Sequence, residues 1–498
     1  MQHRSFWATT AETAPRFPTL DHSIETETLI IGGGLTGMAT AFLLHRAGHS
    51  VQLIEADEIG SGDSGQTSGH LSTATDLQYN YLQKSYGQES ARLIARGMRN
   101  AVDQIKTIAE TEGIDCHFAY EPGYLYTRIS EQTEELEEEY KAARNAGLDV
   151  QLQSSCPLPF EVQQAVRFGN NARFQPLRFI NGLAQRLKAE GVPIFTHTRA
   201  MEVQRDGDHR VVETDQGHRI SAGRVIMATH LPAFAKAEQT ALPPSRTYVM
   251  AYKVKGEVPQ GLFWDMQSPY HYTRNAEYNG QQVLITGGAD HRTGTVQDTD
   301  ACFRELEDYI REHYPVDEML HRWSGQWYEP TDKLPMIGKS ILDERVLVSS
   351  GYSGDGLVFG MMGARLITDL LQEEENPLLN VVRPRRMHLK SDYIKNNAEV
   401  ARHFVKDHLS SYPKDLSSIE PGTGRILQHN GSKYAVYRDE AGELTTLSPT
   451  CTHMGCTVRW NQGERTWDCP CHGGQFSAKG EPLRAPVRSP LKPKPLEE

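Results

Sequence analysis

The chain has 498 residues, 38% of them apolar and 23% charged, an ordinary composition for globular domains, and its length suggests about three of them. The formal net charge of −12 is spread along the chain, so we expect no nucleic-acid partner. No apolar run reaches the roughly 18 residues of a membrane span. Residues 1–20 also lack the layout of a signal peptide, so we expect no transmembrane segment and a cytoplasmic location.

The first predicted elements are typical of a nucleotide-binding turn. They are a strand, a glycine-rich turn, a helix, a second strand and a terminal acid: Thr26–Ile31, Gly32-Gly-Gly34-Leu-Thr-Gly37, Met38–Arg46, Ser50–Ile54 and Glu55. The glycines let the backbone approach a pyrophosphate at the helix N-terminus, and the acid accepts hydrogen bonds from a ribose. A glycine-rich turn in another α/β domain is the alternative, but the full order of elements favours dinucleotide binding.

Later segments indicate that the cofactor extends beyond the first nucleotide-binding turn. Residues 60–70 are too rich in small residues for a helix and are expected to form a loop over an isoalloxazine ring. A strand at 225–230 ends in small residues, and Gly351-Tyr-Ser-Gly354-Asp-Gly-Leu357 opens another helix after the strand Arg345–Ser349. A second glycine-rich helix start suits the other end of one extended cofactor. Between these motifs, five glutamates within 134–139 are expected to form a solvated helix face.

These motifs resemble the flavoprotein family of D-amino-acid oxidase, glycine oxidase and sarcosine oxidase over residues 26–372. The resemblance implies a Rossmann-like α/β FAD-binding fold with an α+β substrate domain. It also implies which residues contact FAD: Gly32, Gly34, Gly37, Glu55, Ser64, Thr67, Ala228, Gly354, Asp355, Gly356 and Leu357.

The chain departs from that family at two places. Sarcosine oxidases with covalent flavin have a cysteine where this chain reads Gly325-Gln326-Trp327, so we expect non-covalent FAD. Those enzymes grip a substrate carboxylate with a lysine and arginines, and the matching positions hold Val358, Ser68 and Leu71. We therefore do not expect a small α-amino acid held in that way, and the expected substrate is an amine or an acid held by another cation such as Arg274 or Lys333.

Two residues are candidates for catalysis. His70, in the small-residue loop, could act as a base or orienting group near neutral pH, or could hydrogen-bond to the loop backbone. Tyr352, beside the second glycine motif, could line the pocket. Trp264, Tyr272 and Trp327 could form an aromatic wall or belong to the core.

The sequence suggests three segments. Residues 1–375 form the oxidoreductase, with FAD-binding parts at about 24–85, 160–235 and 330–375 and substrate parts at about 86–159 and 236–329; residues 376–412 form a linker with a helix, and residues 413–498 a small β domain. In the linker, Glu399, His403 and His408 resemble a mononuclear iron site. Two helical side chains five residues apart are offset by about 140°, so an exposed helix face is the preferred interpretation.

The last segment carries the ligand set of a Rieske [2Fe-2S] cluster. Cys451-Thr-His453 and Cys469-Pro-Cys-His472 supply two thiolates for one iron and two imidazoles for the other. A four-ligand zinc site is the alternative, but these spacings are unusual for zinc. Short alternating strands around both motifs predict an all-β domain.

The segment also resembles respiratory Rieske proteins. That resemblance implies a disulfide between Cys456 and Cys471, which would join the two ligand loops. The serine and tyrosine that hydrogen-bond the cluster region in those proteins are replaced by Gly474 and Phe476. Fewer hydrogen bonds should lower the reduction potential.

Together the motifs predict flavin-dependent oxidation of an amine or amino-acid-like C–N bond, with electrons leaving through the cluster to an external acceptor. In a second interpretation an external donor reduces the cluster, which then delivers electrons to FAD for a reductive or monooxygenase-like reaction. In a third, the protein is a redox sensor or electron carrier without a substrate. The expected partners are a small amine-like substrate and an external electron acceptor or donor.

Overall fold

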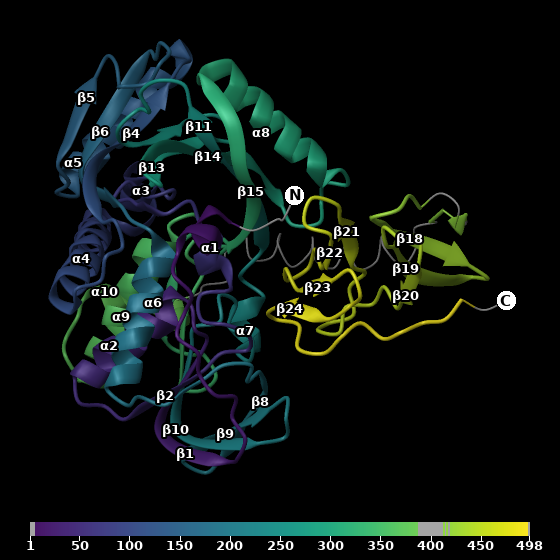
Figure 1. The fold of residues 1–498 in the computed structure, drawn as a ribbon. Coiled ribbons are helices and arrows are strands. Elements are labelled where there is room, and N and C mark those ends of the chain that lie inside the picture. Colours follow the sequence, from purple (N-terminus) through teal and green to yellow (C-terminus); the bar gives the residue numbers. More distant parts are fainter. Residues whose placement is uncertain (1–4, 387–411, 414, 417–418, 497–498) are drawn as a thin grey trace.

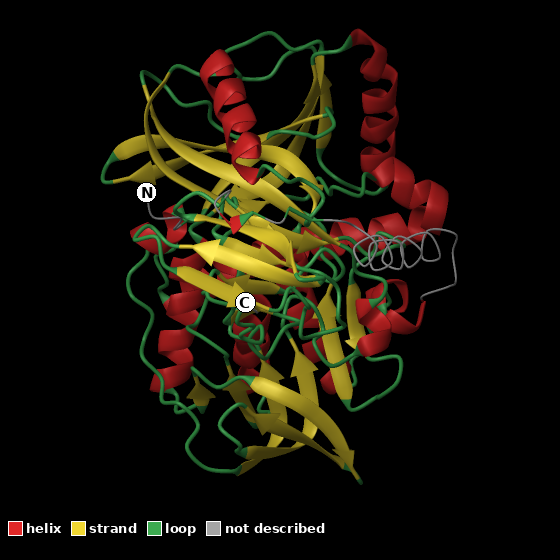
Figure 2. Ribbon diagram, turned by 90° about the vertical axis from the view of Figure 1, so that its right-hand side faces the viewer, coloured by secondary structure: helices red, strands yellow, loops and turns green. Residues whose placement is uncertain are grey.

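The computed structural model describes residues 5–386, 412–413, 415–416 and 419–496 (Figure 1). Two large sheets form the body of the molecule, and a small β domain at the C-terminal end of the chain lies beside them. In the view of Figure 2 this small domain lies in front of the middle of the molecule. The iron-site alternative at Glu399, His403 and His408, and most of the predicted linker, lie outside the described residues.

The first sheet is largely parallel, with the strand order β16-β17-β10-β1-β2-β7. Its edge strand β16 is antiparallel to β17, and the hairpin β8–β9 extends from β10. The strands are β1 (Ile24–Ile31), β2 (Val51–Ile54), β7 (Ile194–Phe195), β8 (Ala200–Asp206), β9 (His209–Thr214), β10 (Arg219–Met227), β16 (Met336–Lys339) and β17 (Val346–Ser350). The last four residues of β1 are apolar or small and buried, as in a strand covered on both faces. The predicted strands at 26–31, 50–54 and 345–349 are therefore confirmed to within two residues.

Helices cover one face of this sheet. The helix α2 (Leu35–Arg46) packs between α6 (Pro176–Ala189) and α9 (Gly356–Leu371), and the long α4 (Gln88–Glu112) packs on α9. The other α-helices in the described part of the chain are α1 (Phe6–Thr10), α3 (Tyr79–Tyr86), α5 (Thr133–Asn145), α7 (Lys236–Gln239), α8 (Thr299–His313) and α10 (Leu378–Val382). No helix among the described residues combines the length and apolar character needed to cross a bilayer.

The prediction that the glutamates of α5 form a solvated face is wrong at one position. Glu139 is only 2% exposed, and its carboxylate accepts hydrogen bonds from the backbone N–H groups of Tyr79 and Asn80, both at 2.8 Å. Burial raises its pKa to about 7. Leu136 and Ala143 share the buried face of this helix, because residues three and four apart lie on one side.

The second sheet has nine strands in the order β15-β11-β14-β13-β12-β4-β6-β3, with β5 paired to β6. Its strands are β3 (His70–Leu71), β4 (Ala119–Thr127), β5 (Val150–Gln153), β6 (Gln164–Arg173), β11 (Pro244–Val254), β12 (Leu262–Asp265), β13 (Tyr272–Tyr278), β14 (Gln281–Arg292) and β15 (Val316–Tyr328). Its pairs are antiparallel except β4 with β12. Strands β3, β12, β13 and β15 of this sheet lie beside the glycine-rich motifs that follow β1 and β17 of the first sheet.

The small β domain consists of two antiparallel sheets. Their strands are β18 (Thr423–His429), β19 (Ser432–Arg438) and β20 (Leu444–Leu447) in one, and β21 (Arg459–Asn461), β22 (Thr466–Asp468), β23 (Gln475–Ser477) and β24 (Pro482–Arg484) in the other. The four sequence-predicted cluster ligands lie on loops next to the second of these sheets. Figure 1 shows that sheet facing the body of the molecule, with β18–β20 on the far side.

Candidate functional site

A cavity of about 310 Å³ runs from the carboxyl ends of the parallel strands to the second sheet. The N-termini of α2 and α9 both open into it, at Gly34–Thr36 and at Asp355–Leu357. Neither helix has an N-cap side chain bonded to its first turn. At the start of α2, Leu35 N donates to Ser64 Oγ at 3.0 Å, and the remaining N–H groups of the two helix starts can receive anions and polar ligand atoms.

The glycine turn is shaped to let a ligand approach the backbone. Gly32 has φ of +115°, and a Cβ there would lie 2.4 Å from the carbonyl oxygen of Ala228. A Cβ on Gly34 would meet Ser64 Oγ at 2.9 Å, in the wall of the cavity. Gly37 does not line the cavity; its Cβ would lie 1.8 Å from the Gly32 carbonyl oxygen, so this glycine permits close helix packing.

Glu55 stands at the end of β2 beside this turn. Its carboxylate accepts a hydrogen bond from Gly33 N at 2.6 Å and one from Asp57 N at 2.9 Å. Burial raises the pKa of this carboxyl, and the two N–H groups partly offset that effect. An acid held in this way at the end of the second strand fits a ribose.

The remaining predicted contacts gather around the same cavity. Its lining includes Ser64, Thr67, Ala228, Gly354, Asp355, Gly356 and Leu357. Bare glycine backbone, two helix starts and one partly buried acid are the groups that a dinucleotide needs, so the residues present fit FAD.

His70 lines the cavity but both of its ring nitrogens are engaged. Nδ1 is 2.8 Å from Ser68 Oγ, and Nε2 donates to the carbonyl oxygen of Thr273 at 3.4 Å. Burial, and then the charge of Arg274, lower its pKa to about 3. The ring is therefore neutral at physiological pH.

Tyr352 also lines the cavity, and its hydroxyl contacts neighbouring side chains. It donates to Ser349 Oγ at 2.6 Å and lies 3.3 Å from Thr36 Oγ1. Burial raises its pKa to about 12. These contacts tie β17 to the start of α2.

An aromatic wall forms at the second-sheet end of the cavity. The ring centroid of His70 lies 5.5 Å from that of Trp264 and 5.7 Å from that of Tyr272, and Tyr270 lies 5.7 Å from Tyr272. Trp327 lines the same cavity from β15. Tyr270 was not among the sequence candidates.

One acid, Asp76, lies beside this wall and was also missed. Its carboxylate is open to the cavity, and it accepts a hydrogen bond of 3.5 Å from the Tyr270 hydroxyl. The carboxylate is open to the cavity but enclosed by the surrounding protein walls; this enclosure, and then the charge of Glu329, raise its pKa to about 6. As the first acid after the small-residue loop, Asp76 could have been identified from its position.

The two cations considered for a substrate carboxylate do not reach the cavity. Arg274 is 2% exposed and donates to the backbone carbonyls of Gly69 and Phe174. Lys333 stacks on the Tyr81 ring at 4.9 Å and pairs with Glu329 at 4.0 Å. Among the described residues, the cavity-lining cations are Arg199, Arg484 and Arg488, which come from other elements than the aromatic wall.

The predicted cluster ligands converge in the small β domain. The thiols of Cys451 and Cys469 lie in contact and are buried, and the rings of His453 and His472 lie 5.1 Å apart. Nδ1 of His472 is buried without a hydrogen-bond partner in the described part of the chain. Burial is the main cause that lowers the pKa of each of these histidines to about 4. Neutral imidazoles with a free nitrogen and paired thiols fit a cluster of the Rieske type.

Cys456 and Cys471 form a disulfide between the two ligand loops. Cys469 lies close enough that its sulfur is within 4.8 Å of both of theirs. The expected disulfide is therefore present in the structure, and it removes these two cysteines from the ligand set.

The two positions at which respiratory Rieske proteins have a serine and a tyrosine are closely packed in this chain. A Cβ on Gly474 would meet Val487 Cγ1 at 2.4 Å, and Phe476 is fully buried. Neither can donate a hydrogen bond to the cluster from a side chain. The lower reduction potential stays a prediction.

Sequence comparison decides the family. The profile described as FAD dependent oxidoreductase matches residues 27–370, and the profile described as Rieske [2Fe-2S] domain matches residues 411–495. The chain belongs to the FAD dependent oxidoreductase family. This oxidoreductase binds FAD, and its Rieske domain binds a [2Fe-2S] cluster.

Relatives share one or both parts of this oxidoreductase. It is 32% identical over 494 residues to the Rieske 2Fe-2S iron-sulfur protein YhfW of Bacillus subtilis, covering 98% of this chain and 97% of YhfW. It is 25% identical to gamma-glutamylputrescine oxidoreductase of Escherichia coli, over 74% of this chain and 88% of that protein. The structure of glycine oxidase from Geobacillus kaustophilus matches with a TM-score of 0.62 at 19% identity, over 73% of this chain and 99% of that one, which shows a likeness of fold.

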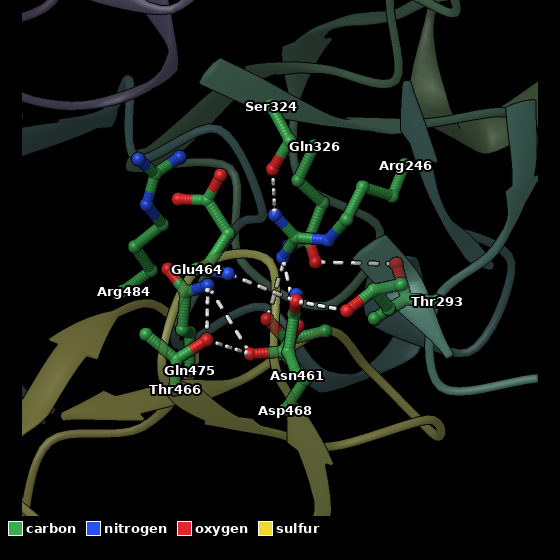
Figure 3. A network of polar contacts seen from close by, with 12 residues as sticks. Arg246, Thr293, Ser324, Gln326, Asn461, Glu464, Thr466, Asp468, Gln475 and Arg484 are labelled. Carbon is green, nitrogen blue, oxygen red and sulfur yellow. Dashed lines mark hydrogen bonds and ion pairs between the residues drawn. The ribbon is translucent and has the colours of Figure 1, made fainter. Parts of the chain in front are cut away.

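The Rieske domain is docked on the oxidoreductase through buried polar groups (Figure 3). Arg246 on β11 and Asp468 on β22 form an ion pair of 3.0 Å in which both side chains are at most 4% exposed. Burial lowers the pKa of Arg246, but the charges of Asp468 and Glu464 raise it above its usual value. Thr299 adds two contacts of 2.9 Å: it donates to Asn461 Oδ1 and accepts from Gly463 N.

The loop that carries His472 is held by β15. Gln326 Nε2 donates to the carbonyl oxygen of Gly473 at 3.0 Å, and the Tyr328 hydroxyl donates to that of His472 at 3.2 Å. Gln326 and its neighbours Gly325 and Trp327 also line the flavin cavity. One strand therefore contacts both cofactor sites.

Proposed function

We propose that this protein oxidises the C–N bond of a cationic amine at FAD and passes the electrons through its own Rieske cluster to an external acceptor. Bound FAD supplies hydride acceptance, and the bound cluster supplies single-electron transfer. The observation that carries the proposal is the double role of β15, which lines the flavin cavity and holds the loop of His472.

The groups between the two sites are close packed. His230 lines the cavity, its Nε2 donates to the Gln326 carbonyl oxygen at 3.0 Å, and its ring centroid lies 4.8 Å from that of Tyr328. Tyr328 in turn contacts the backbone of His472. A connection made of direct hydrogen bonds and a ring contact supports transfer within one chain.

The aromatic wall and Asp76 support an amine without a carboxylate. Rings such as Trp264, Tyr270 and Tyr272 attract an ammonium group through their faces, and a neighbouring carboxylate adds charge attraction. The wall elements bring no lysine or arginine side chain into the cavity, within the residues that the structure describes. An α-carboxylate placed here would have lost its hydration without gaining a cation.

Asp76 is better suited than His70 to take a proton from the bound ammonium. The ring of His70 has both nitrogens engaged and a pKa of about 3, so it is a weak base. The Asp76 carboxylate has a pKa of about 6 and faces the cavity. Removal of that proton gives the neutral amine that oxidation requires. In this proposal His70 orients the aromatic wall.

The test is anaerobic mixing of the purified protein with pairs of compounds that differ by one carboxylate, such as an N-alkylamine and its α-carboxy analogue. We expect the amine to bleach the flavin absorbance, followed by the EPR signal of a reduced cluster. A Cys469→Ser variant, which removes one cluster ligand, should bleach without that EPR signal. Bleaching only by NAD(P)H or reduced ferredoxin would instead show the reverse electron flow. If no donor bleaches the flavin, the protein is a sensor or carrier.

A further inference from the structure

The Rieske domain supplies part of the wall of the flavin cavity. Residues 483–488, at the end of β24 and in the loop that follows it, contribute five lining residues, two of them arginines. No motif in the oxidoreductase part predicts this contribution. It means that the cofactor site extends across the domain boundary.

The two arginines have different surroundings. Arg484 forms an ion pair with Asp63 of the small-residue loop. Burial raises the pKa of Asp63, but the charges of Arg484 and His230 lower it below its usual value. Asp63 also accepts a hydrogen bond from Gln326 N at 3.0 Å. The charge of Arg484 is therefore neutralised, and its role is to hold the loop.

Arg488 has no acidic partner of this kind. One Nη donates to the carbonyl oxygen of Met201, and the guanidinium lies 4.9 Å from the centre of the Phe234 ring. Within the described residues it forms no ion pair. Burial lowers its pKa, and Glu202 only partly offsets this. A half-buried guanidinium at a cavity wall without a carboxylate suits an anionic ligand.

The neighbours of Arg488 place it at the nucleotide end of the cavity. Met201 follows the segment in which Thr198 N donates to the carbonyl oxygen of Glu55 at 2.9 Å. Phe234 follows the segment of Ala228, whose carbonyl oxygen lies against Gly32. Both segments thus belong to the end where the glycine turn and the ribose acid lie. The aromatic wall lies at the second-sheet end of the cavity.

We propose that Arg488 of the Rieske domain binds the pyrophosphate of FAD, so that the two domains share one cofactor site. A guanidinium can donate two parallel hydrogen bonds to phosphate oxygens, in the same cavity as the glycine turn and the start of α2. This inference concerns cofactor affinity and is independent of the substrate.

The test measures FAD and ADP affinity in full-length protein from which FAD has been removed while the cluster is retained. Arg488→Met keeps the stem that packs on Phe234 and removes the charge, whereas Arg488→Lys keeps a charge. Arg425→Ala removes an exposed arginine of β18, in the sheet remote from the cavity, and serves as the control. Flavin fluorescence gives the FAD dissociation constant, and calorimetry gives that of ADP.

We expect Arg488→Met to weaken both ligands about tenfold or more, since a hydrogen-bonded charge pair is lost. Arg488→Lys should stay within about threefold of the parent, and Arg425→Ala should match it. The cluster EPR signal confirms folding; if Arg488→Met does not fold, Arg488→Gln replaces it with the same expected loss. The proposal would be overturned if Arg488→Met binds ADP as tightly as the parent protein does. It would also be overturned if the Met and Lys variants lose the same affinity.

Discussion

Replacing Arg246 by methionine should release the Rieske domain from the oxidoreductase. At an effective dielectric constant of about 20, two unit charges 3.0 Å apart attract by about 5.5 kcal/mol. Desolvation of both groups offsets part of this, and removing one partner of a buried pair costs about 3–5 kcal/mol. The Asp468 carboxylate would remain buried opposite a methionine. The ratio of docked to undocked domain should fall about a hundredfold or more.

The amide of Gly463 reports this equilibrium. It donates across the interface to Thr299 Oγ1 and is buried, so it can exchange with solvent only when the domain opens. Hydrogen exchange of the peptide that contains it should become about a hundredfold faster in Arg246→Met. A matched control is Lys253→Met on the same strand, because Lys253 pairs with Glu318 in a solvent-exposed bridge of 2.6 Å. An exposed pair is screened by solvent and contributes little to stability, so this control should not change exchange at Gly463.

A double-mutant cycle decides whether the pair itself is responsible. Asp468→Asn removes the second charge and keeps an oxygen for the hydrogen bond from Asn461 Nδ2, which measures 2.8 Å. In combination with Arg246→Met it should recover part of the loss, with a coupling energy of about 2 kcal/mol or more. A coupling energy near zero, or unchanged exchange at Gly463 in the single variant, would refute the reasoning.

Three further outcomes follow from the site and the core. Asp76→Asn should raise KM for a cationic amine about tenfold, and an unchanged KM would argue against charge recognition. In the parent protein, kcat/KM should fall as the pH drops below about 6, because the Asp76 carboxylate becomes protonated. The folded-state pKa of Glu139 is raised from 4.5 to about 7, so the native state binds the extra proton and stability falls by about 3 kcal/mol as pH rises through this interval. Urea unfolding at a series of pH values should show this loss of stability, and Glu139→Gln should abolish it. If the pH dependence of the unfolding free energy persists in the variant, another group causes it. Tyr328→Phe should lower the cluster potential in an EPR-monitored redox titration, because the hydroxyl that donates to the His472 carbonyl oxygen favours the more negative reduced cluster; an equal or higher potential would contradict this.

The cofactor motifs could be predicted because their information is local. The turn around Gly32 requires a bare backbone within a few residues, and the cluster motif places Cys451 and His453 two residues apart. Strand order and helix cover then bring the distant motifs together at one edge of the sheet. The order of elements along the chain is sufficient for that inference.

The residues that the sequence did not reveal depend on tertiary contacts. Arg246 and Asp468 belong to different domains, and nothing in their flanking residues marks either as buried. Arg488 follows the last strand of its sheet and belongs to no motif. Glu139 is different, because helical periodicity places it with Leu136 on one face. Because Glu139 is charged, it is predicted to be solvated, although the helical pattern in the sequence places it on the buried face.

The docked Rieske loop has a consequence for how the holoprotein matures. Arg484 and Arg488 close one side of the flavin cavity, and β15 supports the loop that carries His472. A large cofactor enters most easily while that side is open. Flavin loading should therefore precede closure of the C-terminal domain, and a bound flavin should exchange slowly afterwards.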